Sequence, residues 1–355
     1  MQKYLKMSIS HCIRFGYLCT SAMEALFFIG NSDGSVTCHL CPHNCRIKSG
    51  MAGICRVRLN NNGVLVASNY GFLSSIYPDP LEKKPLYHFY PGKTILSVGS
   101  VGCNMRCNCC QNWQISQSSI NDISGTYYTP LKIAEMALNI DGNIGIAYTY
   151  NEPTIGFEFM LDTAKIIRRA GMKNVIVSNG YINAEPLGIL LDYADAFNID
   201  LKAFSDSFYR KVTGARLEPV LETLKQVRRS GRHLEITNLV IPGQNDDPEE
   251  FGRMISWISK ELGSETVLHL SRYHPAYKMN IGATPADSLE ALYEIAIKEL
   301  CYVYVGNINL EGCQDTKCRK CGMTLIKRSG YHTEVINLSQ NGSCAACGEK
   351  ILGNL

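Results

Sequence analysis

Cys103-Asn-Met-Arg-Cys107-Asn-Cys109-Cys110 follows a short apolar run and places four cysteines within eight residues. Cys103, Cys107 and Cys110 have the spacing C-x3-C-x2-C, at which thiolates can wrap a loop around a [4Fe-4S] cluster. The loop supplies three such thiolates, so one iron stays open to another ligand, as the metal does in catalytic zinc sites. Zinc ligation and inert buried thiols are the alternatives, but zinc knuckles favour C-x2-C pairs. We therefore predict an iron–sulfur cluster with an open position.

Strand-length apolar runs alternate with amphipathic segments from this region to about residue 305. The expected strands are 94–101, 144–150, 174–178, 196–201, 234–241, 267–273 and 301–305. The expected helices, which have helical spacing of apolar residues, are 131–139, 157–170, 185–193, 219–230, 248–262 and 286–300. Such alternation is typical of a parallel sheet with crossover helices, in a doubly wound sheet or a full or partial (β/α) barrel.

Polar side chains follow successive expected strands, where the chemistry of (β/α) barrels lies. They are Asn151, Glu152, Ser178, Asn179, Asp200, Lys202 and His274. Glu152 can accept from an ammonium group, Asp200 from ribose hydroxyls, and Lys202 can pair with a carboxylate. Each residue alone fits a helix cap or a surface position, but the set suits a zwitterionic amino acid that carries a ribose.

The cysteine loop resembles the signature of the radical S-adenosylmethionine superfamily. The resemblance implies a partial (β/α)6 barrel and a [4Fe-4S] cluster whose open iron is chelated by S-adenosylmethionine. One-electron cleavage of this cofactor would give a 5′-deoxyadenosyl radical that abstracts a hydrogen atom from a substrate. Glu152-Pro153 takes the place of the superfamily's Gly-Gly-Glu motif, so the strand-end set above is assigned to S-adenosylmethionine.

A narrower resemblance covers most of the chain. Segments 81–92, 102–112, 147–154 and 235–243 resemble the radical enzyme of the AmmeMemoRadiSam system, and 200–202 and 273–274 are similar to pyruvate formate-lyase activating enzymes. The resemblance implies Memo-like and AMMECR-type partners, and we expect an electron donor such as flavodoxin or ferredoxin. A glycyl-radical-enzyme activase is the alternative function. Position 109 is usually aromatic in this family, whereas Cys109 puts a spare thiol beside the cluster.

Two further cysteine groups flank the alternating region. The C-terminal group has the pattern C-x2-C…C-x2-C of a tetrahedral site, for which zinc is the default and iron the alternative. The N-terminal group has the spacing C-x2-C-x3-C-x9-C, which is compatible with zinc or with a second [4Fe-4S] cluster. We slightly favour zinc. The members are Cys318, Cys321, Cys344 and Cys347 in the first group and Cys38, Cys41, Cys45 and Cys55 in the second.

Length and composition indicate one large domain with small appendages in a chain of 355 residues. We expect a tail or misassigned start at 1–22, an N-terminal cysteine-rich segment and linker at 23–92, and the barrel at 93–305. Residues 306–355 should form a zinc-ribbon or rubredoxin-like module.

The net charge of +3 and the absence of a dense basic run argue against a nucleic-acid or membrane partner. Eleven of the sixteen cysteines are clustered at ligand spacings, and no signal peptide is visible, which indicates the reducing cytoplasm. A non-catalytic metal scaffold or electron carrier is the alternative of another class, but it leaves the strand-end charges without a purpose.

Overall fold

A computed structural model describes residues 23–353, so the expected tail at 1–22 lies outside the described residues. Its centre is an eight-stranded sheet in the order β16-β15-β14-β13-β12-β11-β9-β8. The seven expected strands are all present and parallel. They are β9 (Thr94–Gly99), β11 (Asn143–Tyr148), β12 (Lys173–Ser178), β13 (Ala196–Asp200), β14 (His233–Val240), β15 (Val267–Arg272) and β16 (Val303–Gly306).

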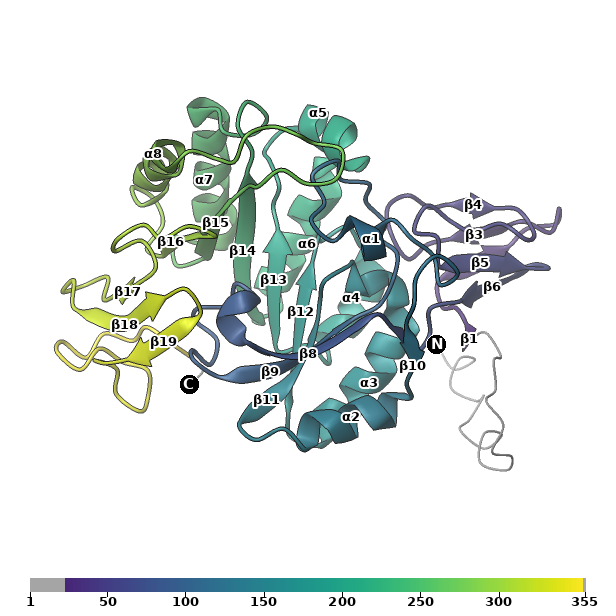
Figure 1. The fold of residues 1–355 in the computed structure, drawn as a ribbon, viewed down its shortest axis with the longest axis horizontal. Helices are drawn as coiled ribbons and strands as arrows, with labels where there is room; N and C mark the ends of the chain where they lie inside the picture. The colour runs from purple at the N-terminus through teal and green to yellow at the C-terminus, as the bar shows by residue number, and fades with distance from the viewer. Residues whose placement is uncertain (1–22, 354–355) are drawn as a thin grey trace.

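The six expected helices connect these strands and lie along one side of the sheet (Figure 1). They are α2 (Pro130–Leu138), α3 (Phe157–Arg169), α4 (Ala184–Leu191), α6 (Leu217–Arg229), α7 (Pro248–Leu262) and α8 (Ala286–Ala296). Local signals set their starts: Asp247 caps α7 by accepting from Glu250 N, with Pro248 at the first helical position. The α/β prediction is confirmed, and the barrel is partial because the edge strands β16 and β8 do not pair with each other.

The segment before the first parallel strand belongs to the sheet and its core. β8 (Ser75–Pro80) pairs antiparallel with β9, although it lies in the range 23–92 that we expected to hold only the cysteine-rich segment and a linker. Two prolines obscure this strand in the sequence, and an edge strand tolerates them. The residues after β8 fill the inner side of the sheet, in a buried cluster of Leu81, Leu86, Phe89, Ile95, Ala147, Val175 and Ala196.

A buried carboxylate fastens this segment to the middle of the sheet. Glu235 on β14 accepts from the backbone N–H groups of Tyr87 (2.9 Å) and His88 (2.7 Å). Its oxygens also lie 2.8 Å from Nε2 of His233 and 2.6 Å from Nε2 of His269. Burial alone would raise the pKa of Glu235, but the two histidines lower it well below its usual range.

Lowering the pH from 7.5 to 5.5 should destabilise the protein through His88, whose ring contacts the hydroxyl of Tyr304 at 2.6 Å. Burial lowers the pKa of His88 to about 3. Below about pH 6.5 the His88 side chain therefore binds a proton in the unfolded chain but not in the folded protein. The free energy of unfolding falls by about 1.4 kcal/mol for each pH unit below that value. The melting temperature of wild type should fall by a few degrees more than that of His88→Gln, and equal shifts would contradict the prediction.

Two small modules flank the sheet at opposite ends of the view in Figure 1. The N-terminal module has two three-stranded sheets, β2-β3-β4 and β1-β6-β5, and the C-terminal module has one, β17-β18-β19. Their strands are β1 (Met23–Glu24), β2 (Phe28–Gly30), β3 (Val36–Cys38), β4 (Arg46–Ile47), β5 (Arg58–Asn61), β6 (Val64–Ala67), β17 (Thr316–Lys317), β18 (Thr324–Ser329) and β19 (His332–Val335). One buried arginine ties each module to the rest: Arg58 pairs with Glu158 of α3 at 3.1 Å, and Arg328 donates to Tyr87 O at 2.8 Å.

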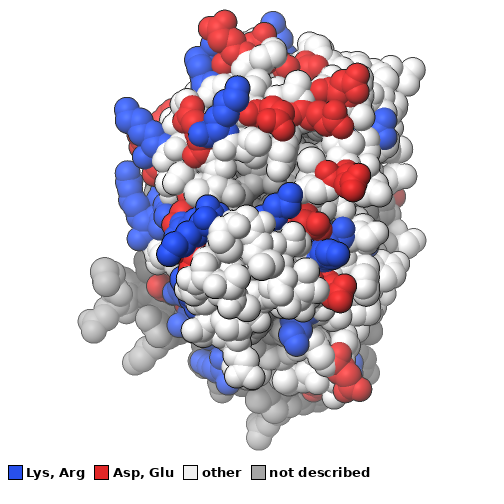
Figure 2. All heavy atoms as spheres, turned by 90° about the vertical axis from the view of Figure 1, so that its left-hand side faces the viewer, with Lys and Arg blue, Asp and Glu red and all other residues white. Residues whose placement is uncertain are grey.

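The face that carries the C-terminal module mixes charges of both signs (Figure 2). Lysine and arginine side chains lie beside aspartate and glutamate side chains there, without a continuous basic area. Among residues 23–353, no helix combines the length and apolar character that a membrane crossing requires.

Candidate functional site

The cysteine loop, residues 102–112, begins just after β9, at the carboxyl end of the parallel strands. Asn151, which follows β11, holds its entrance: its Oδ1 accepts from Ser100 N at 3.0 Å, and its Nδ2 donates to Gly102 O at 2.9 Å. Gly102 has a φ of +86°, which favours glycine. The amide of Asn151 therefore positions the backbone of the loop. Its contact with S-adenosylmethionine stays a prediction.

The far side of the loop is held by two other segments. The backbone N–H groups of Arg106 and Asn108 donate to Thr213 O (2.7 Å) and Val212 O (2.9 Å). The segment after β15 also contacts the loop, because Lys278 N donates to Asn108 O at 3.0 Å. The loop is thus fixed at several points before any ligand binds.

The predicted cluster ligands Cys103, Cys107 and Cys110 are half-buried on this loop. Two N–H groups point at the sulfur of Cys103, Met105 N at 3.3 Å and Asn179 Nδ2 at 3.6 Å. Such donors stabilise a thiolate and tune the potential of an iron–sulfur cluster. Burial raises the pKa of Cys107 to about 12, so iron binding would have to displace a proton from it. The donor set fits a [4Fe-4S] cluster held by three thiolates.

Cys109, the spare thiol, lies in the main hydrophobic core and is 6% exposed. Burial raises its pKa above the usual value, and the ammonium of Lys202 opposes this shift. In this position the side chain contributes to packing, although it lies next to a predicted ligand in the sequence.

Glu152 is buried and accepts four hydrogen bonds from the chain. Its Oε1 accepts from Thr154 N (3.0 Å), Thr154 Oγ1 (2.7 Å) and Ser178 Oγ (2.8 Å), and its Oε2 accepts from Asn179 N (2.8 Å). Burial raises the pKa of the carboxyl. Glu152 therefore links the ends of β11 and β12. Because Oε2 takes one of these bonds, it keeps acceptor capacity for a ligand.

Ser178 and Asn179 extend this connection to the cysteine loop. Ser178 Oγ accepts from Gly180 N at 3.0 Å, in addition to its bond to Glu152. Asn179 Nδ2 donates to Asn104 Oδ1 at 2.9 Å, beside its contact with the sulfur of Cys103. The strand-end residues thus form one network with the loop, while their contact with S-adenosylmethionine stays a prediction.

Asp200 and Lys202 form an ion pair after β13, with Nζ 2.8 Å from Oδ2. Burial alone would lower the pKa of Lys202, but Asp200 and the thiolate of Cys107 would raise it well above its usual range. The ammonium therefore adds positive charge next to the thiols. His274 is exposed on the segment after β15.

Asp79 and Lys84 are residues that the sequence analysis did not single out. The ion pair between them (2.7 Å) is buried, and Lys84 Nζ lies 4.4 Å from the ring centre of Tyr150. Tyr150 donates its hydroxyl to Asp79 and has a φ of +72°, and Asn112 Nδ2 donates to its carbonyl at 2.7 Å. These contacts fix the turn that precedes Asn151. The adjacent lysines Lys83 and Lys84, in a segment rich in proline and aromatic residues, were the available signal, because buried charges need partners.

The C-terminal cysteine group has the geometry of a single-ion site. The four sulfurs lie within 4.8 Å of one another, and the Cys318–Cys347 and Cys321–Cys344 pairs are 3.5 and 3.7 Å apart. A Zn–S distance of about 2.3 Å places tetrahedral sulfurs about 3.8 Å apart. The thiols can therefore close around one metal ion with little movement.

Replacing Cys344 by serine should remove about one equivalent of zinc or iron per chain, because a tetrathiolate site needs all four ligands. Loss of the metal should also lower the thermal stability of the C-terminal module. Cys301→Ser is the matched control, since Cys301 is exposed and lies outside the group. Elemental analysis checks the result, and an unchanged metal content in Cys344→Ser would contradict it.

Comparisons with known proteins agree with this geometry. Residues 97–255 match the family model of the radical SAM superfamily. An uncharacterized protein of Methanocaldococcus jannaschii is 46% identical over 331 residues, which are 92% of this chain and 98% of that protein. Pyruvate formate-lyase 1-activating enzyme of Escherichia coli is 24% identical over 49% of this chain and 71% of its own length. A radical SAM methyltransferase from Sphaerobacter thermophilus has a similar fold, with a TM-score of 0.50 and 14% identity over 61% of this chain and 67% of that one.

Proposed function

Because the chain belongs to the radical S-adenosylmethionine superfamily, we propose that it cleaves S-adenosylmethionine reductively and abstracts a hydrogen atom from an organic substrate. The observation that carries this proposal is the fixed loop with three thiols, two N–H groups directed at Cys103, and a network to the strand ends. A structural zinc site would need a fourth ligand, and it would not require a hydrogen-bond network to the strand ends.

Each residue of the site has a separate role in this proposal. Cys103, Cys107 and Cys110 would hold the [4Fe-4S] cluster, which with S-adenosylmethionine supplies one-electron cleavage to a 5′-deoxyadenosyl radical. Glu152 Oε2 would accept from the cofactor's ammonium group, and Asp200 would accept from its ribose hydroxyls. Lys202 balances the charge of the thiolates and orients Asp200.

An anaerobic assay tests this function. The chain is reconstituted with iron and sulfide, reduced with dithionite and incubated with S-adenosylmethionine, and 5′-deoxyadenosine is quantified by chromatography. We expect 5′-deoxyadenosine to form in proportion to the loaded cluster. A fully loaded protein that yields none would overturn the proposal.

A second candidate function is activation of a glycyl-radical enzyme, favoured by the relation to the activating enzyme of Escherichia coli. In that case the hydrogen donor is a glycine of a partner protein. A glycine-centred EPR signal on a co-purified partner, dependent on S-adenosylmethionine, would decide for this function. Formation of 5′-deoxyadenosine without such a signal would favour a small-molecule substrate.

Partners and location complete the proposal. A flavodoxin or ferredoxin would supply the electron, and Memo-like and AMMECR-type proteins are the proposed associates. The cysteines of residues 23–353 are all free, which supports a reducing compartment such as the cytoplasm.

A further inference from the structure

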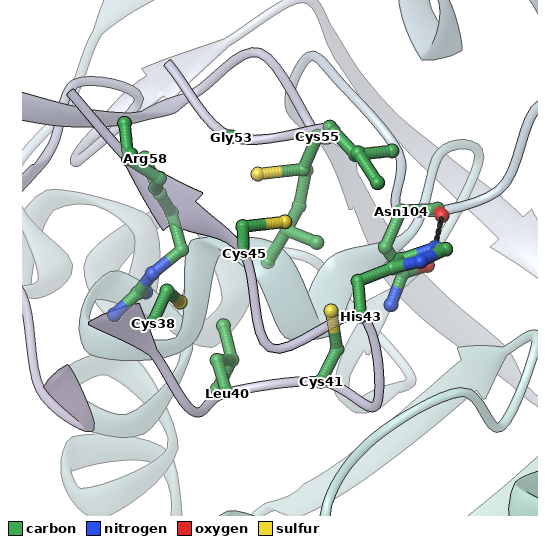
Figure 3. Close-up of a pocket in the computed structure, with 12 residues that line it drawn as sticks. Cys38, Leu40, Cys41, His43, Cys45, Gly53, Cys55, Arg58 and Asn104 are labelled. Atoms are coloured by element: carbon green, nitrogen blue, oxygen red, sulfur yellow. Dashed lines mark hydrogen bonds between the residues drawn. The ribbon is translucent and has the colours of Figure 1, made fainter. Parts of the chain in front are cut away.

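The N-terminal cysteine group, Cys38, Cys41, Cys45 and Cys55, surrounds one cavity (Figure 3). Cys38 ends β3, Cys41 and Cys45 lie on the connection to β4, and Cys55 precedes β5. Figure 3 shows the four side chains entering a common space, with His43 and Asn104 on one side and Arg58 on the other. Segments up to 17 residues apart in sequence therefore bring four thiols together in an enclosed position.

The sulfurs around this cavity are farther apart than those of a site for one tetrahedral ion. Sulfurs that bind one zinc ion lie about 2.3 Å from the metal and therefore about 3.8 Å from one another. Within residues 23–353, the C-terminal thiols come within 4.8 Å of one another, whereas the N-terminal thiols do not meet this limit. The same chain thus contains two different four-thiol geometries.

A buried positive charge lines the cavity. Arg58 is 1% exposed, and its Nη1 pairs with Glu158. Its Nε has no hydrogen-bond partner among the described residues. An unpaired buried donor costs about 1–3 kcal/mol, so its presence beside four thiols calls for an acceptor in the cavity. The sulfides and thiolates of an iron–sulfur cluster are such acceptors.

The N-terminal cysteine group also touches the cysteine loop on both sides of Cys103. Before Cys103, a methyl group placed on Gly102 would lie 2.5 Å from the carbonyl oxygen of Cys55. After Cys103, Asn104 lines the cavity, and its carbonyl accepts from His43 Nε2 at 2.7 Å when that nitrogen carries the proton. The two cysteine sites are therefore separated by little more than the backbone of the cysteine loop.

We propose that Cys38, Cys41, Cys45 and Cys55 bind a second [4Fe-4S] cluster, adjacent to the cluster of the cysteine loop. The separation of the sulfurs, the unpaired Nε of Arg58 and the contacts with Gly102 and Asn104 carry this assignment. The proposal takes the second of the two alternatives that the cysteine spacing left open, in place of the slight preference for zinc. Four protein thiolates complete the coordination of this cluster, so S-adenosylmethionine does not bind to it.

The test measures acid-labile sulfide, which a zinc site or a mononuclear iron site does not contain. The full chain is reconstituted anaerobically, and wild type should contain about eight sulfides per chain, four for each [4Fe-4S] cluster. The triple variant Cys103→Ala, Cys107→Ala, Cys110→Ala leaves the N-terminal group untouched and should retain about four sulfides. The EPR signal of its reduced cluster should not change when S-adenosylmethionine is added.

The reciprocal variant is Cys41→Ala with Cys45→Ala, in which the more deeply buried Cys38 and Cys55 remain. It should also contain about four sulfides, and its signal should change with S-adenosylmethionine. Cys313→Ser is the matched control and should match wild type. A folded triple variant without sulfide, or one zinc per chain that disappears with Cys41 and Cys45, would overturn the proposal.

Discussion

Replacing Cys107 by alanine should abolish the formation of 5′-deoxyadenosine, whereas Cys109→Ala should retain it. Cys107 is one of three thiolates that the cysteine loop offers to the cluster, and two thiolates do not hold a [4Fe-4S] cluster in place. The thiol of Cys109 lies in the hydrophobic core, so its removal costs packing and no ligand. The product is measured by chromatography after anaerobic reduction.

Sulfide content and melting temperature separate this result from misfolding. Cys107→Ala should lose about four sulfides per chain, the content of one cluster, and before reconstitution its melting temperature should be close to that of wild type before reconstitution. Cys109→Ala should keep the sulfide of wild type. If Cys109→Ala lost the cluster as well, Cys109 would be a ligand and the assignment of the three cysteines would be wrong.

The parallel sheet could be predicted from the sequence because its signal is local. Each of the seven parallel strands is a short apolar run, an amphipathic helix lies between each strand and the next, and the order of these strands along the chain is their order in the sheet. β8 has no such signal, because it contains two prolines, which a strand tolerates only at the edge of a sheet. Whether a strand lies at the edge depends on the arrangement of the whole sheet and cannot be read from the local sequence. The inner cluster around Leu86 depends on the same long-range arrangement.

The sequence predicted which residues take part in the candidate site but not which hydrogen bonds they make with one another. Spacing identified the three cysteine groups, and the strand ends identified Glu152 and Asn179. Which hydrogen bonds these residues make depends on contacts between separate strands, such as Asn179 with the sulfur of Cys103. Likewise, the distance between sulfurs distinguishes a zinc site from a cluster site, and no spacing of cysteines in a sequence determines it.

Glu152 holds the ends of β11 and β12 together, and under the proposed function its remaining acceptor would also bind the cofactor. Glu152→Ala should leave the buried donors Thr154 N and Asn179 N unpaired, at about 1–3 kcal/mol each. We therefore expect a melting temperature lower by roughly 4–12 °C, at about 2 °C per kcal/mol for a chain of this length. Binding of S-adenosylmethionine should be lost, because the turn before Thr154 loses its anchor.

Glu152→Gln separates the two roles. The glutamine keeps one carbonyl oxygen for the donors of Thr154 and Ser178, loses the hydrogen bond from Asn179 N to Oε2, and removes the negative charge that would face the cofactor's ammonium group. A hydrogen bond to a charged group contributes about 1.5–3 kcal/mol, so the dissociation constant for S-adenosylmethionine should rise by about 10- to 150-fold. Thr154→Ala is the control, since it removes one donor from Oε1 and leaves the charge. Calorimetric titration of the reconstituted protein measures the affinity. If Glu152→Gln bound the cofactor as tightly as Thr154→Ala, Glu152 would serve only to connect β11 and β12, and the ammonium contact would have to come from another residue.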